Sequence, residues 1–230
     1  MNFLASLESS KPGWYYEIPS QYSGDSEYKV YPQSQYLLYL TFKRLNRLDL
    51  ARQICQANLF GVPAVDRVGY SNDRFCVLDN DAPPFYLAGQ TQLPIAYDEI
   101  ALVGHYRALT GDMIGAQQCA TILKGNWDPG LGVLGMDPGD KTANNGSGLF
   151  RVYKTALAGT LYARVGSKTD CINTATKLQL MQDLQTKGWI TDLDANGKPN
   201  GMPNIETTCL CLICLHCAQL GGTGFSVSYP

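Results

Sequence analysis

The densest group of side chains that could bind a metal lies near the C-terminal end of the chain. On a helix, Cys214 and Cys217 share a face and could both reach one ion, because residues three apart are neighbours. His216 is turned about 160° away from Cys214 and lies roughly 10 Å along the axis from Cys209, so it completes no four-ligand site. The cysteines serve equally well as small apolar residues in a tightly packed helix. We expect no bound zinc and no other cofactor. The group consists of Cys209, Cys211, Cys214, His216 and Cys217.

An acidic turn resembles the opening of a calcium-binding loop. Asp192, Asp194 and Asn196 occupy alternate positions, and Gly197 follows them. The twelfth position, which carries a bidentate glutamate in such loops, is Pro203 in this chain. Asp-Ala-Asn-Gly is also an ordinary turn sequence, since its residues tolerate positive φ. The sequence therefore allows either a calcium ligand set or a turn without a metal.

Several tyrosines lie in long stretches that are rich in glycine and proline, Tyr70 and Tyr86 among them. Tyrosine offers a large contact area at a low cost in conformational entropy, so these side chains could bind a protein or a carbohydrate. They could equally pack the loops onto the rest of the fold. Both interpretations stay open at this stage.

Composition and charge exclude several classes of protein. The 230 residues carry 18 basic and 20 acidic side chains, for a formal charge of −2, which gives no electrostatic footprint for nucleic acid. The longest apolar run, residues 209–217, is about half the ~20 residues that a membrane-spanning helix needs, so we expect no membrane insertion. The first residues carry no basic segment followed by an apolar one, so we expect no signal peptide. The sequence favours the cytoplasm or an assembled particle as its location.

Four segments of the chain repeat one apolar pattern and would form the buried helices of the fold. Each ends in glycine or asparagine, the residue types that close a helix in the left-handed conformation. The first three copies are each followed by a more amphipathic segment, beginning near Asp49, Asp112 and Thr169, and we expect Asp112 and Thr169 to be N-caps. The four segments are 35–46, 100–111, 155–166 and 210–221.

A helix pair cannot bury its apolar face alone, so successive repeats must stack. The sequence predicts a single all-α domain with buried inner helices and half-exposed outer helices, joined by long ordered loops. This is an arrangement of the α/α-toroid type. The expected repeats are 1–46, 47–111, 112–166 and 167–221, with a tail at 222–230.

The stretch from Gln185 to Trp189, followed by a glycine-rich loop and Ile205-Glu-Thr-Thr, resembles the repeat of terpenoid cyclases and protein prenyltransferases. The resemblance implies an α/α toroid. It does not extend to catalysis, because the aspartate-rich motifs of the cyclases and the zinc ligands of the prenyltransferases have no counterparts in this chain. Function on such a scaffold has to be argued from the site.

In a toroid the starts of the inner helices line one mouth of the central cavity. The repeat register places Glu99 and Lys154 at equivalent positions there, with Asp98 and Tyr153 beside them. Glu99 and Lys154 could neutralise each other, or they could form an acid/base couple if burial shifts their pKa values.

Two classes of function follow from these patterns. The first is a non-catalytic binding or assembly module, a subunit of a larger complex or particle such as a viral structural protein. Its partners would be other protein subunits, and a glycan is a further possible ligand. The alternative is an enzyme acting on a carbohydrate or an isoprenoid at the toroid mouth, with Glu99, Lys154 and Asp98 as its catalytic groups. We favour the module, because four inner helices are fewer than the enzymes of this architecture have.

Overall fold

The computed structural model describes residues 2–8, 13, 15–16, 32–58, 74–78 and 93–222. Helices dominate these residues and the strands are two residues long, which confirms the prediction of an all-α chain. Tyr70 and Tyr86, the predicted binding surface, lie outside the described residues.

The described part of the chain contains the following elements in order. The helices are α1 (Asn2–Ser6), α2 (Pro32–Arg44), α3 (Leu48–Asn58), the short 3₁₀ helix η3 (Arg74–Leu78), α4 (Tyr97–Leu109), α5 (Met113–Gly125), α6 (Pro138–Gly146), α7 (Val152–Arg164), α8 (Lys168–Gln179) and α9 (Ile205–Gln219). The strands are β1 (Trp127–Asp128), β2 (Val133–Leu134), β3 (Phe150–Arg151) and β4 (Asp192–Leu193), and they form the antiparallel pairs β1–β2 and β3–β4.

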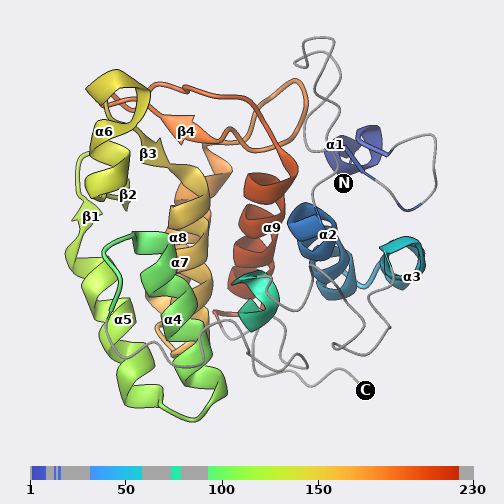
Figure 1. Cartoon of the computed structure of the whole chain (residues 1–230), viewed down its shortest axis with the longest axis horizontal. Helices are drawn as coiled ribbons and strands as arrows, with labels where there is room; N and C mark the ends of the chain where they lie inside the picture. The colour runs from blue at the N-terminus through green and yellow to red at the C-terminus, as the bar shows by residue number, and fades with distance from the viewer. Residues whose placement is uncertain are drawn as a thin grey trace.

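Four helices stand side by side and form the centre of the molecule. Figure 1 shows them as a row in the order α4, α7, α9 and α2, and each packs against the next. We call them the inner helices. Three further helices cover them from outside: α5 packs on α4, α8 on α7 and α9, and α3 on α2. The element η3 contacts both α4 and α2, the two ends of the row.

The ends of the inner helices follow the predicted repeat. Each helix is closed two residues after its last turn by a residue in the left-handed conformation, as the sequence pattern predicts. These residues are Asn46 (φ 55°), Gly111 (φ 90°), Gly166 (φ 82°) and Gly221 (φ 70°).

Equivalent glycines of two repeats make equivalent contacts. A Cβ atom on Gly104 of α4 would lie 2.6 Å from Leu161 of α7 and would also touch α5. A Cβ atom on Gly159 of α7 would lie 2.5 Å from the Sγ of Cys214 in α9 and 2.7 Å from Thr174 in α8. In both repeats, the missing side chain lets an inner helix approach the next inner helix and its own outer helix. α4 and α7 thus pack in the same way at these two glycines.

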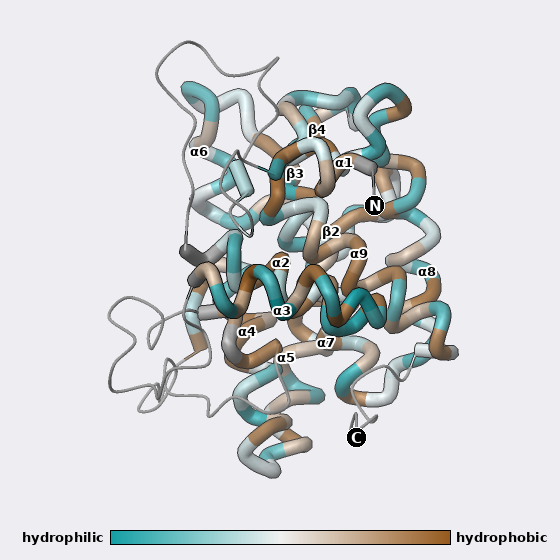
Figure 2. The backbone as a smooth tube through the Cα atoms, turned by 90° about the vertical axis from the view of Figure 1, so that its right-hand side faces the viewer, coloured by the Kyte–Doolittle hydropathy of each residue, from teal (hydrophilic) through white to brown (hydrophobic). Residues whose placement is uncertain are grey.

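The outer helices have one apolar face. In α3, Ala51 and Ile54 are buried while Arg52, Gln53 and Gln56 are exposed, and Figure 2 shows hydrophilic and hydrophobic residues alternating along this helix. Such a pattern is typical of a helix that lies on a core. None of the described helices is long and apolar enough to cross a membrane.

The predicted starts of the outer helices are correct in one case and wrong in the other. Asp112 is the N-cap of α5, and its side chain accepts a hydrogen bond from the backbone N–H of Gly115. Thr169 lies inside α8, whose N-cap is Ser167, because the helix begins directly after the left-handed Gly166. A left-handed residue therefore fixes both the end of one helix and the start of the next.

Candidate functional site

The short helix α6 lies over the starts of α4 and α7, where the sequence places the mouth of a central cavity. The residues at its N-terminus strongly favour the start of a helix. Asp137 caps the helix by accepting from the backbone N–H of Asp140, and the Asp140 side chain accepts from the N–H of Asp137 in return. Pro138 occupies the first helical turn, where its fixed φ suits a helix and no N–H is required. The reciprocal capping holds both carboxylates in fixed positions.

Lys154 of α7 reaches these two carboxylates from below. Its Nζ lies 2.7 Å from Oδ2 of Asp137 and 2.9 Å from each carboxylate oxygen of Asp140. Asp98 of α4 lies further away, at 3.9 Å. The side chain of Lys154 is only 8 % exposed, and those of the three aspartates are 8 % exposed or less. An ammonium and three carboxylates are therefore buried together.

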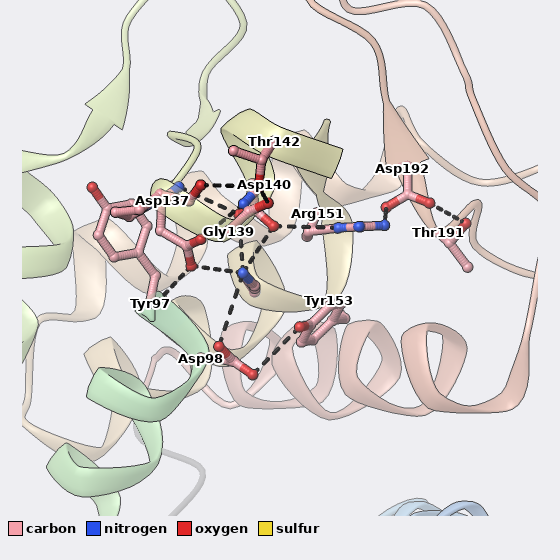
Figure 3. A network of polar contacts seen from close by, with 12 residues as sticks. Tyr97, Asp98, Asp137, Gly139, Asp140, Thr142, Arg151, Tyr153, Thr191 and Asp192 are labelled. Carbon is pink, nitrogen blue, oxygen red and sulfur yellow. Dashed lines mark hydrogen bonds and ion pairs between the residues drawn. The ribbon is translucent and has the colours of Figure 1, made fainter. Parts of the chain in front are cut away.

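The network extends from this centre to the β3–β4 pair (Figure 3). Arg151 lies 3.3 Å from Asp140 and 2.8 Å from Asp192. The hydroxyl of Thr191 donates to Asp192, and that of Tyr153 donates to Asp98. The network thus joins α4, α6, α7 and the β3–β4 pair at one end of the inner helices.

Burial and hydrogen bonding act against each other in this network. Burial disfavours the charged form of Asp137, yet the bonds from Lys154 and from the N–H groups of Tyr97 and Asp140 hold its pKa below the ordinary value. Burial also acts to lower the pKa of Lys154, but its bonds to Asp137 and Asp140 raise that pKa overall. For Asp140 burial prevails, and its pKa is raised in spite of the bond from Lys154.

The structure changes the predicted partner of Lys154. The sequence register places Glu99 opposite it, whereas the carboxylates that contact it among the described residues are those of Asp98, Asp137 and Asp140. Glu99 is half-buried on α4 beside Asp98. Sequence reasoning did not identify Asp137 or Asp140 as partners of Lys154. Asp-Pro-Gly-Asp does carry a capping-box signal, but nothing in it names Lys154 as a partner.

The acidic turn is arranged as a turn and not as a cage for an ion. Asp192 is buried in β4 and engaged by Arg151 and Thr191. Oδ1 of Asp194 accepts backbone N–H bonds from Asn196 and Lys198, which is the pattern of an Asx turn. These contacts are those of a turn, and the calcium ligand set stays a prediction.

The cysteines of α9 are fully buried side chains in the core, as are most of their neighbours. Burial raises the pKa of Cys211 well above its ordinary value, and it raises that of Cys217 to about 12 although the charge of Arg44 acts to lower it. A thiol that stays protonated is neither a good nucleophile nor a good metal ligand. Within the described residues, no group of three or more His, Cys, Asp and Glu side chains is arranged to hold a metal ion.

A second candidate site is an open groove on the outer side of the molecule. It has a volume of about 460 Å³ and lies between α5 and α8, beside the β1–β2 pair, with Tyr162 of α7 among its lining residues. A neighbouring hollow of about 310 Å³ shares Lys124, Tyr162 and Asp170 with it. We call the two hollows together the α5–α8 groove. Sequence analysis gave no sign of it, because its walls come from three separate segments.

Comparison with protein-family models, with curated proteins and with solved structures finds no match to this chain. What the two sites can do therefore rests on their side chains. The network around Lys154 holds buried charges that are bonded to one another, whereas the groove is open to solvent and offers both aromatic and polar groups.

Proposed function

We propose that this protein is a non-catalytic binding module. One observation carries the proposal: the three N–H donors of Lys154 are matched by three short contacts to Asp137 and Asp140, so this group has no donor left for a substrate. The carboxylates are equally engaged, since each of them also accepts a backbone N–H bond within the α6 capping box. The charged groups of Lys154, Asp137 and Asp140 therefore hold α6 in place.

The direction of the pKa shift on Lys154 supports the same conclusion. A lysine that acts as a base or a nucleophile needs a lowered pKa, so that the neutral amine is populated near neutral pH. The carboxylates around Lys154 raise its pKa, although burial alone would lower it. The side chain is therefore held in the protonated form, which suits a structural ion pair.

Asp140 has the raised pKa that a general acid requires. Its geometry does not suit that role, because its side chain is 4 % exposed and both oxygens contact Lys154. A general acid must reach the atom that it protonates, whereas the carboxyl group of Asp140 is covered by α6.

The scaffold of the proposed module is a small α/α toroid. The row α4, α7, α9 and α2 has η3 in contact with both of its ends, and the outer helices cover it from outside. The repeated contacts of Gly104 and Gly159 support the same arrangement. Other protein subunits remain the predicted partners of the module in a larger assembly.

A screen for turnover tests the proposal. We expect the wild-type protein to convert none of a panel of glycans and prenyl diphosphates, because the ionisable groups described around Lys154 are engaged by one another. Asp98→Asn and Glu99→Gln at the mouth would be compared with Asp49→Asn on the exposed surface of α3. Turnover by the wild type that disappears in the two mouth variants but survives in Asp49→Asn would overturn the proposal, provided that all variants remain folded.

A further inference from the structure

The α5–α8 groove is shaped for a small ligand. Its volume of about 460 Å³ falls within the range of roughly 300–1,000 Å³ that is usual for small-molecule sites. Lys177 extends along the groove because Gly132 has no side chain: a Cβ atom there would lie 2.7 Å from Cε of Lys177. Gly132 also has a φ of 68°, which favours glycine. The backbone of the β1–β2 turn thus leaves room for the lysine stem at the edge of the groove.

An aromatic pair provides the apolar part of the groove. The rings of Trp127 and Tyr162 lie 6.3 Å apart at an angle of 50°. Trp189, which holds the equivalent place in the next repeat, is buried and donates its indole N–H to the carbonyl of Leu178. Trp127 is only half-buried and lines the groove. One tryptophan of the repeat is therefore packed inside the fold, whereas the other is exposed at a groove.

The hydroxyl of Tyr162 is a polar group that lacks a partner. The side chain is 2 % exposed, and its oxygen makes no hydrogen bond to any of the described residues. A buried polar group without a partner costs free energy. Because this oxygen is itself buried, a ligand hydroxyl reaches it and recovers that free energy only where the side chains around it move aside. Because Tyr162 contributes to both hollows of the groove, a ligand in either one would lie close to this residue.

The groove is lined by two lysines and one aspartate, so its charges sum to +1, with Lys177 at its edge. Lys124 lies 2.9 Å from both carboxylate oxygens of Asp170, so these two side chains neutralise each other. The hydroxyls of Thr174 and Thr176 donate to carbonyls of their own helix, which leaves their oxygens able to accept. A purely apolar ligand would leave these polar groups without partners.

From these observations we propose that the α5–α8 groove binds a neutral saccharide, with Trp127 against the C–H face of a sugar ring and Tyr162 bonded to a sugar hydroxyl. A pyranose ring combines an apolar face with a rim of hydroxyls that both donate and accept, and the groove offers the complement of each. The inference rests on the proposed function, since it names the ligand of the binding module.

Titration with neutral oligosaccharides tests the inference. The probes are maltohexaose, cellohexaose, chitohexaose and mannohexaose, followed by tryptophan fluorescence and by calorimetry on the full chain. We expect at least one of them to bind. Trp127→Ala should weaken that binding about 10-fold or more, as expected for the loss of a central aromatic contact. Tyr162→Phe should weaken it about 3- to 10-fold, as expected for the loss of one hydrogen bond.

Two controls keep these outcomes interpretable. Tyr162→Phe should leave the melting temperature unchanged or raise it, because the deleted hydroxyl has no partner in the part of the chain that the structure describes. Gln56→Ala, an exposed site on α3, should leave saccharide binding unchanged. If Trp127→Ala fails to fold, Tyr162→Phe still decides the matter.

Several results would overturn the inference. They are the absence of binding by all four probes, binding that is insensitive to Tyr162→Phe, or a preference for acidic oligosaccharides that is lost at high salt. If a protein partner were found whose binding is lost on substitution of groove residues, saccharide binding would also be refuted, but the proposal of a binding module would stand. Cleavage of a bound saccharide would instead refute the proposed function and leave the groove as its ligand site.

Discussion

Replacing Lys154 by methionine is expected to lower the free energy of unfolding by about 3–5 kcal/mol, as for other broken buried ion pairs. The substitution keeps most of the side-chain volume and removes the ammonium. Asp137 and Asp140 would then remain buried without the cation that compensates them, and burial already acts to raise the pKa of both. Equilibrium unfolding in urea, followed by circular dichroism, measures the change.

Lys124→Met is the matched control for this substitution. Lys124 also forms an ion pair with an aspartate at 2.9 Å, but its side chain is 64 % exposed. Its loss should cost about 1 kcal/mol or less, the range of surface pairs. Adding Asp140→Asn to Lys154→Met should recover part of the lost stability, because it removes one uncompensated charge. Equal costs for the two lysine variants, or no coupling between Lys154 and Asp140, would contradict the structural role of the network.

Gly159→Ala is expected to destabilise the protein by about 1–3 kcal/mol, the usual cost of overpacking a core. Its Cβ atom would lie 2.5 Å from the Sγ of Cys214 and 2.7 Å from Thr174, and both neighbours are buried. Alanine favours a helix more than glycine does, by about 1 kcal/mol, so a measured loss reports the collision and not the backbone. Thermal and urea unfolding would both show it.

Gly125→Ala at the end of α5 provides the comparison. No atom lies within 4 Å of the position that its Cβ would take. This variant should be as stable as the wild type, or more stable by up to about 1 kcal/mol. If Gly159→Ala also stabilised the protein, the close packing of α7 against α8 and α9 would be contradicted.

The helices of this fold were predictable because their signals are local. The residues that close the inner helices, from Asn46 to Gly221, adopt the conformation for which glycine and asparagine are suited. The spacing of these residues also gave the repeat. The start of α8 was misplaced by two residues, since threonine is a good cap by type but the preceding left-handed glycine decided the position.

The partners of Lys154 were not predictable from the sequence alone. Its contacts are 17 residues away at Asp137 and 14 residues away at Asp140. They depend on where α6 lands over the inner helices, and no local pattern encodes that placement. The α5–α8 groove is hidden for the same reason. A repeat register relates equivalent positions of the repeats. It therefore pointed to Glu99 as the partner of Lys154 and gave no information about an aspartate in an inserted helix.

The pH dependence of the network follows from the raised pKa of Lys154. The folded state holds the proton more tightly than the unfolded chain, whose lysine pKa is the ordinary 10.5. The contribution of Lys154 to stability is therefore fully present below pH 10.5 and is lost as the pH rises through the folded value. A catalytic lysine would show the opposite sign.

The titration of Lys154 itself tests the central claim most directly. Heteronuclear NMR of protein labelled at the lysine side chains, with the resonance assigned by Lys154→Met or by Lys154→Arg, follows the protonation of this one ammonium. The account predicts a pKa above 10.5, with Asp137→Asn bringing it down. A pKa for Lys154 below 10.5 would contradict the account and place a reactive amine at the mouth.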